Sequence, residues 1–92
     1  MASIKNLKKE INFLAGELVY ECYFTSLLSD SLKKDEVNQL IASTIDYRNN
    51  FIAQANHRDG KNNPKLVKTY FKGLRKNLYT ELKQLTEKLK AI

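Results

Sequence analysis

The side chains that could carry acid–base chemistry or hold a metal ion are few. The candidates for such a cluster are Glu17, Glu21, Asp46 and His57. Helical bundles that bind two metal ions place a Glu-x-x-His pair on each of two helices, and this sequence contains no such pair. His57 stands in a polar segment, where a solvent-exposed imidazole is the ordinary outcome. We therefore expect no metal site.

Nucleophilic catalysis has no better support. No base is paired at a recognisable spacing with Cys22, Ser26 or Ser29, and no glycine-rich phosphate loop is present. Cys22 is the single cysteine, so no intramolecular disulfide can form, and on an apolar helical face its thiol behaves as a small buried hydrophobe. The sequence therefore predicts a protein that is not an enzyme and that uses no cofactor and no small-molecule substrate.

Arg48 interrupts the apolar stripe of a helix that we expect over residues 34–56. A cation in that position must find a partner or extend to the edge of the helix. A hairpin about residues 31–32 brings Arg48 level with residues 15–17. We predict a structural ion pair between Arg48 and Glu17, with Glu21 as the alternative acceptor; a site for a carboxylate or phosphate ligand is the other interpretation.

Residues 13–28 are the most apolar stretch, and at 3.6 residues per turn they show two apolar faces. The first face contains Leu14, Ala15, Leu18, Val19 and Cys22, which continue Ile4, Leu7 and Ile11. The second, which we call the aromatic face, contains Phe13, Gly16, Tyr20, Tyr23, Phe24 and Leu27. A small bundle leaves part of such a second face uncovered. We predict a homodimeric interaction module whose partner interface consists of Tyr20, Tyr23, Phe24 and Leu27.

The charge is concentrated in the last third of the chain. Residues 61–92 contain nine Lys or Arg and two Glu, a net charge of +7, whereas residues 1–60 have a net charge of −1. On a helical wheel one sector, the basic row, contains Lys65, Lys68, Lys72, Arg75, Lys76, Tyr79, Lys83 and Lys90. This row would extend about 37 Å along a helix. It fits nucleic acid or an acidic protein as the alternative partner, and an ordinary solvated face or a membrane surface are the other interpretations.

The elements that position these residues are three long helices, expected over residues 4–28, 34–56 and 64–91. Ser3 and Asn63 are the predicted N-caps, and Pro64 suits the first helical position. Asp35 and Glu36 suit the positive end of the second helix. Short polar turns between helices of this length predict an all-α, antiparallel up-down-up bundle that forms a single domain over residues 1–92. No apolar run approaches the length of a membrane span, so no membrane insertion is expected.

Two segments carry a resemblance. The run SIKNLKKEINFLAGELVYECY at residues 3–23 and the run IDYRNNFIAQAN at residues 45–56 are similar to short, uncharacterised all-helical proteins of Bacteroidetes. The resemblance implies helical architecture and a bacterial, cytoplasmic origin. A single thiol and the absence of a signal peptide fit the same cytoplasmic location.

Overall fold

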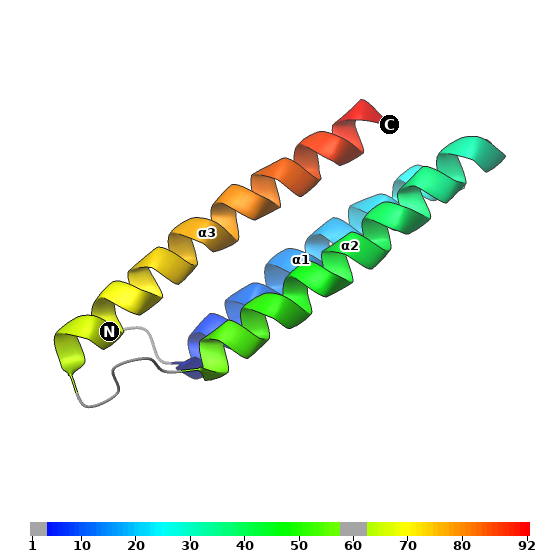
Figure 1. Ribbon diagram of the computed structural model, residues 1–92. Helices are drawn as coiled ribbons and strands as arrows, with labels where there is room; N and C mark the ends of the chain where they lie inside the picture. The colour runs from blue at the N-terminus through cyan, green and yellow to red at the C-terminus, as the bar shows by residue number, and fades with distance from the viewer. Residues whose placement is uncertain (1–3, 58–62) are drawn as a thin grey trace.

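The computed structural model describes residues 4–57 and 63–92 and is built of three long helices. These are α1 (Ile4–Leu27), α2 (Ser31–Asn56) and α3 (Pro64–Ala91), which form the predicted all-α, up-down-up bundle (Figure 1). The molecule is an elongated rod of 53 × 19 × 17 Å. The contact between α1 and α2 is the most extensive, because these helices form a tight hairpin. No described helix has both the length and the apolar character needed to cross a membrane.

The turn between α1 and α2 is tighter than predicted. Asp30 is the N-cap of α2, and its side chain accepts a hydrogen bond from the backbone N–H of Lys33 at 3.0 Å. The prediction of a start near Lys34 was wrong by one helical turn, because it relied on Asp35 and Glu36 as first-turn acids. An Asp side chain at the N-cap satisfies an orphan N–H directly, which determines the helix start more strongly than a dipole interaction does.

The start of α3 is as predicted. The side chain of Asn63 accepts hydrogen bonds from the backbone N–H groups of Lys65 and Leu66 at 3.1 and 3.3 Å, and Pro64 occupies the first turn. The predicted cap at Ser3 and residues 58–62 of the polar turn expected between the second and third helices lie outside the described residues.

One continuous core fills the space between the helices. Its buried apolar members are Leu7, Ile11, Ala15, Leu18, Cys22, Val37, Leu40, Tyr47, Phe51, Ala55, Leu74, Leu78 and Leu85. The first apolar face of α1 supplies five of them, as its periodicity predicts. Thr44 is also buried, and its hydroxyl donates to the carbonyl of Leu40 at 2.8 Å, so this polar group is satisfied.

Side-chain hydrogen bonds between helices fix which residues share a level along the rod. The Tyr47 hydroxyl donates to the carbonyl of Leu78 at 2.8 Å, and the Tyr70 hydroxyl donates to that of Gln54 at 2.6 Å, so α2 and α3 are joined at two levels. Glu10 of α1 is joined to Arg75 of α3. The start of α1, the end of α2 and the start of α3 therefore lie at the same end of the rod, as Figure 1 shows.

Candidate functional site

The aromatic face of α1 lies on the surface of the bundle. The exposed fractions of its large side chains are 64% for Phe13, 61% for Tyr20, 57% for Tyr23, 51% for Phe24 and 60% for Leu27. The rings of Tyr20 and Phe24 contact each other edge to face, with centroids 5.2 Å apart. Large apolar side chains are usually more than half buried, so this is an unusual surface for a small domain.

A glycine lies within the aromatic face. A Cβ built on Gly16 would meet nothing within 4 Å, and the same is true of Gly73 on α3. Neither position needs glycine for packing inside the bundle, although glycine in a helix interior costs about 0.5–1 kcal/mol relative to alanine. Gly16 differs from Gly73 in having exposed aromatic side chains on the same face, where its bare backbone would allow close approach of another helix.

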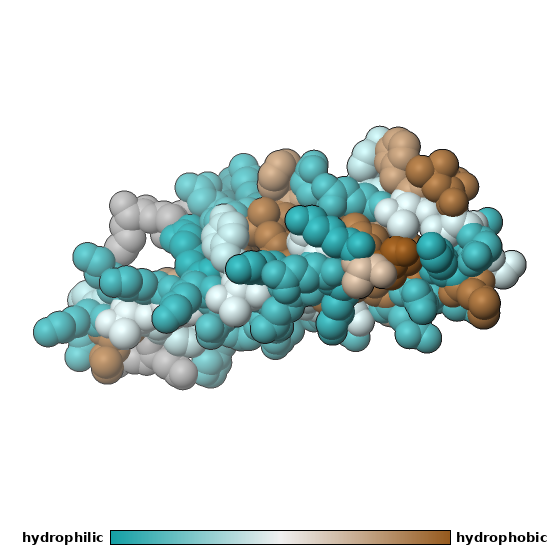
Figure 2. Space-filling view, turned by 90° about the horizontal axis from the view of Figure 1, so that it is seen from above, coloured by the Kyte–Doolittle hydropathy of each residue, from teal (hydrophilic) through white to brown (hydrophobic). Residues whose placement is uncertain are grey.

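Hydrophobic and hydrophilic side chains separate along the rod. In Figure 2 the end near the grey residues is mostly hydrophilic, and the hydrophobic side chains on this face gather toward the opposite end. The aromatic face begins at Phe13 and runs toward that opposite end, where α1 joins α2. Leu28 and Leu32 at the hairpin are exposed as well.

The basic row of α3 is divided by the structure. Its six lysines are exposed, whereas Arg75 is partly buried and pairs with the Glu10 carboxylate at 3.3 Å. The Tyr79 hydroxyl donates to the other oxygen of the same carboxylate. Both side chains are thus committed to the contact between α1 and α3. Because the Arg75 side chain is 37% exposed, this ion pair contributes less than about 1 kcal/mol.

The hydrogen bond with Glu10 also changes the acidity of Tyr79. It is the main reason why the pKa of the Tyr79 phenol is raised above the usual tyrosine value, with partial burial and the Glu10 charge acting in the same direction and Arg75 opposing them. The phenol therefore stays protonated at neutral pH and remains a donor. Tyr79 serves as a link between helices, in addition to being an exposed aromatic ring in the row.

Arg48 does not form the predicted ion pair with Glu17. The guanidinium is exposed, and it donates through Nε to the Asn12 side-chain oxygen and through Nη1 to that of Asn49. The physical reason is the register of the hairpin. The turn is centred near residues 29–30, which places Arg48 level with residues 10–12, and Asn12 is more than one helical turn away from Glu17. Glu17 and the alternative acceptor Glu21 are both exposed on α1.

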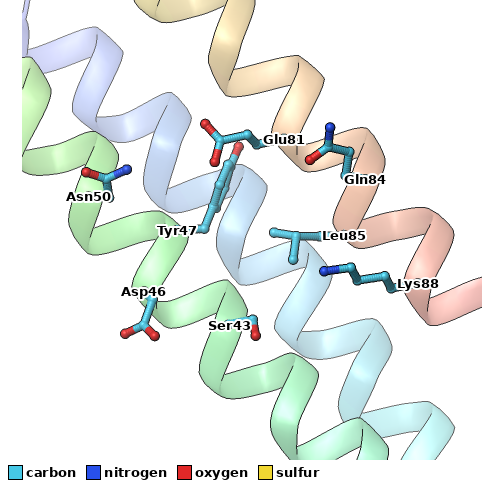
Figure 3. A pocket seen from close by; sticks show the side chains of 8 residues that line it. All are labelled: Ser43, Asp46, Tyr47, Asn50, Glu81, Gln84, Leu85 and Lys88. Carbon is cyan, nitrogen blue, oxygen red and sulfur yellow. The ribbon is translucent and has the colours of Figure 1, made fainter.

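A shallow groove of about 370 Å³ lies between α2 and α3 (Figure 3). Its lining residues are Ser43, Asp46, Tyr47, Asn50, Glu81, Gln84, Leu85 and Lys88. Leu85 and Lys88 extend from α3 toward α2, whereas Asp46 points away from α3. Apart from the buried Tyr47 and Leu85, every lining side chain is exposed to solvent. The groove is therefore an open, solvent-exposed seam between the two helices, and its polar groups do not converge in a closed pocket.

Tyr47 is the one group at this groove with a strongly perturbed acidity among the described residues. Burial is the main cause of its raised pKa, and the negative charge of the nearby Glu81 adds to it. A tyrosine with a raised pKa in the folded state binds its proton more tightly there than in the unfolded state. Its stabilising contribution is present in full below the unfolded pKa of about 10 and is lost as pH rises above that value.

This linkage predicts the pH dependence of a Tyr47→Phe variant. At about pH 8 the variant is expected to be less stable than the wild type by about 1 kcal/mol, because the hydrogen bond to Leu78 is lost. At about pH 11 the wild type loses about 1.4 kcal/mol through ionisation of Tyr47 on unfolding, so its advantage should disappear and the variant should become slightly the more stable of the two. Urea denaturation of both proteins at the two pH values measures this. A constant difference would contradict the linkage.

The remaining chemical candidates are not brought together. In residues 4–57 and 63–92, no three His, Cys, Asp or Glu side chains lie close enough to hold a metal ion. Cys22 is buried, and its pKa is raised by burial and by the charge of Glu21, which keeps the thiol protonated and unreactive.

Two interhelical residues were missed by the sequence interpretation. Tyr47 lies outside the predicted apolar stripe of α2, yet it is buried. Its hydroxyl donates a hydrogen bond to the Leu78 carbonyl, so the polar group is satisfied inside the bundle. Glu10 lies at the edge of α1, and its partners Arg75 and Tyr79 are more than sixty residues away in sequence. On a helical wheel both residues lie at the edge of the apolar stripe. Such a position indicates a contact with another helix only when the register between the helices is known.

Comparison with known proteins adds no assignment. No protein-family model matches the chain, and no curated protein and no solved structure is significantly similar to it.

Proposed function

We propose that this chain is a small non-enzymatic helical interaction module that pairs with a second copy of itself through the aromatic face of α1. One observation carries the proposal: five large apolar side chains on one face of α1 are each more than half exposed in the folded bundle. Aromatic side chains bury about 150–250 Å² each, so this face leaves on the order of 550 Å² of mostly apolar surface uncovered. A standard protein interface buries about 800 Å² per partner. The side chains that flank the aromatic face can supply the remaining area.

Charge favours a two-fold, antiparallel arrangement of the two α1 helices. A parallel pair would bring the lysine-rich starts of α1 and α3 of both copies together, whereas an antiparallel pair keeps them at opposite ends. The protected thiol of Cys22 fits a reducing cytoplasm as the location of this pair.

Sedimentation velocity over the micromolar concentration range tests the proposal. The expected result is a monomer that converts reversibly to a dimer as the concentration rises. A sedimentation coefficient that stays at the monomer value throughout the range would reject self-association.

The pair Gly16→Ala and Gly73→Ala tests where the two helices meet. Each change is expected to raise the stability of the dilute monomer by about 0.5–1 kcal/mol, because both sites have open space for a methyl group. In addition, Gly16→Ala should weaken dimerisation about tenfold, since the methyl group would push apart two closely packed helices. Gly73→Ala, on α3, is the matched control and should leave the dimerisation constant unchanged. Equal dimerisation constants for the two variants would place the helix crossing elsewhere.

A further inference from the structure

In the folded chain the positive and negative charges are concentrated at opposite ends of the rod. Along the sequence, by contrast, the excess positive charge lies in the last third of the chain. The hydrogen bonds of Arg48 with Asn12 and of Tyr47 with Leu78 mark a common level across the three helices. On one side of that level lie residues 4–12, 47–57 and 63–78, and we call this part of the rod the basic end. Figure 1 shows it as the end where α1 and α3 begin.

The basic end is strongly cationic. Its basic side chains are Lys5, Lys8, Lys9, Arg48, Lys65, Lys68, Lys72, Arg75 and Lys76. Against these nine stands one acid, Glu10, so the described residues of this end have a net charge of +8. The other described residues contain five Lys or Arg and eight Asp or Glu, a net charge of −3. Lys83 and Lys90, which belong to the basic row on the wheel, therefore lie in a part of the rod where acids prevail.

Local structure adds to the positive potential of this end. The starts of α1 and α3 both lie here, and neither helix has an acid in its first turn. The amide groups at a helix start carry a partial positive charge, and the positive side chains of Lys5 and Lys65 lie next to it, which is electrostatically unfavourable. The one acid, Glu10, is occupied by Arg75 and Tyr79. Bound phosphates would relieve this repulsion, which makes an anionic partner favourable.

We propose that the basic end binds the phosphate backbone of a nucleic acid. Amide side chains that can donate to phosphate lie among the cations on α2, at Asn49, Asn50 and Asn56, and all three are exposed. Surface binding to a membrane needs apolar side chains on the same surface as the cations. The large exposed apolar side chains of the described residues lie mainly beyond the basic end, on the aromatic face and at the hairpin.

Two triple variants of α3 test whether the phosphate backbone binds at the basic end or along the whole length of the helix. The first, Lys65→Gln, Lys68→Gln and Lys72→Gln, removes three charges from the basic end. The second, Lys83→Gln, Lys88→Gln and Lys90→Gln, removes the same number of charges from the opposite end of α3. All six lysines are exposed, so both variants should fold, and circular dichroism checks this.

The measurement is fluorescence anisotropy of a short DNA duplex titrated with each protein at several salt concentrations. We expect the wild type to bind with an affinity that falls steeply as salt rises, and the first variant to bind at least tenfold more weakly, with a salt slope lower by about 2–3. The second variant should bind as the wild type does. Equal loss in both variants would assign binding to the lysines along the whole of α3 and overturn the basic end as the site.

Two further titrations decide the class of partner. Polyglutamate and vesicles that contain phosphatidylserine present negative charge without a nucleic-acid backbone. If either one binds the wild type as tightly as the duplex does, or if the duplex does not bind at low salt, nucleic acid is rejected as the partner. The results of these titrations do not depend on whether the chain dimerises, because dimerisation is measured separately and without any added polyanion.

Discussion

A Phe24→Glu variant is expected to remain folded and to dimerise at least about 100-fold more weakly than the wild type. Phe24 is 51% exposed in the bundle, so a carboxylate at this position stays hydrated in the monomer. In the dimer the same carboxylate would be buried against the apolar side chains of a second aromatic face, which is strongly unfavourable. Sedimentation equilibrium measures the dimerisation constant, and far-UV circular dichroism reports on the fold.

Leu66→Glu is the matched control for this change. Leu66 is 55% exposed and belongs to the first turn of α3, where a carboxylate is compatible with the helix dipole. The dimerisation constant of the Leu66→Glu variant should equal that of the wild type. If both substitutions weakened dimerisation to the same extent, the effect would reflect added charge, and the aromatic face would not be the interface.

The second large effect is expected from Phe51→Ala. Phe51 is completely buried, and its ring contacts that of Tyr47 with a centroid distance of 5.0 Å. Removal of a buried phenylalanine side chain costs about 3–5 kcal/mol, which is a large part of the total stability of a small domain. Urea denaturation at low protein concentration should show a marked decrease in the midpoint.

Phe13→Ala is the control for the loss of a phenylalanine side chain as such. Phe13 is the most exposed aromatic residue of α1, so its removal should change the stability of the dilute monomer by less than about 0.5 kcal/mol. A loss below about 1 kcal/mol for Phe51→Ala would contradict the position of Phe51 at the centre of the core.

The fold could be predicted from the sequence because local signals and packing agree. The periodic apolar residues of α1 gave its buried face, and Asn63 with Pro64 gave the start of α3. The start of α2 was misplaced because Asp30 was interpreted as part of a turn and not as an N-cap. That error of one turn moved the hairpin register and assigned Arg48 to Glu17 in place of Asn12.

The candidate surfaces were predictable to different degrees. The exposure of Tyr20, Tyr23, Phe24 and Leu27 follows from the angular position of these residues on α1, because a helix in a three-helix bundle keeps one face toward solvent. The basic end could not be found in the same way. It combines lysines from the first tenth of the chain with others from its last third, and only the register between helices brings them together.

The two surfaces divide the molecule into parts with different chemistry. The aromatic face covers the part of α1 that follows Asn12, whereas the basic end comprises the residues on the other side of that level. An antiparallel dimer through the aromatic faces would leave a basic end accessible at each tip of the assembly. Dimerisation and anion binding are therefore expected to proceed without competition.

Amide chemical shifts of ¹⁵N-labelled protein during dilution report most directly on self-association through the aromatic face of α1. We expect concentration-dependent shifts for residues 13–28, with those of Gly16, Tyr20 and Phe24 among the largest, and unchanged shifts for the first half of α3. Shifts that remain constant over the whole α1 helix, or that change mainly on α2 and α3, would contradict it.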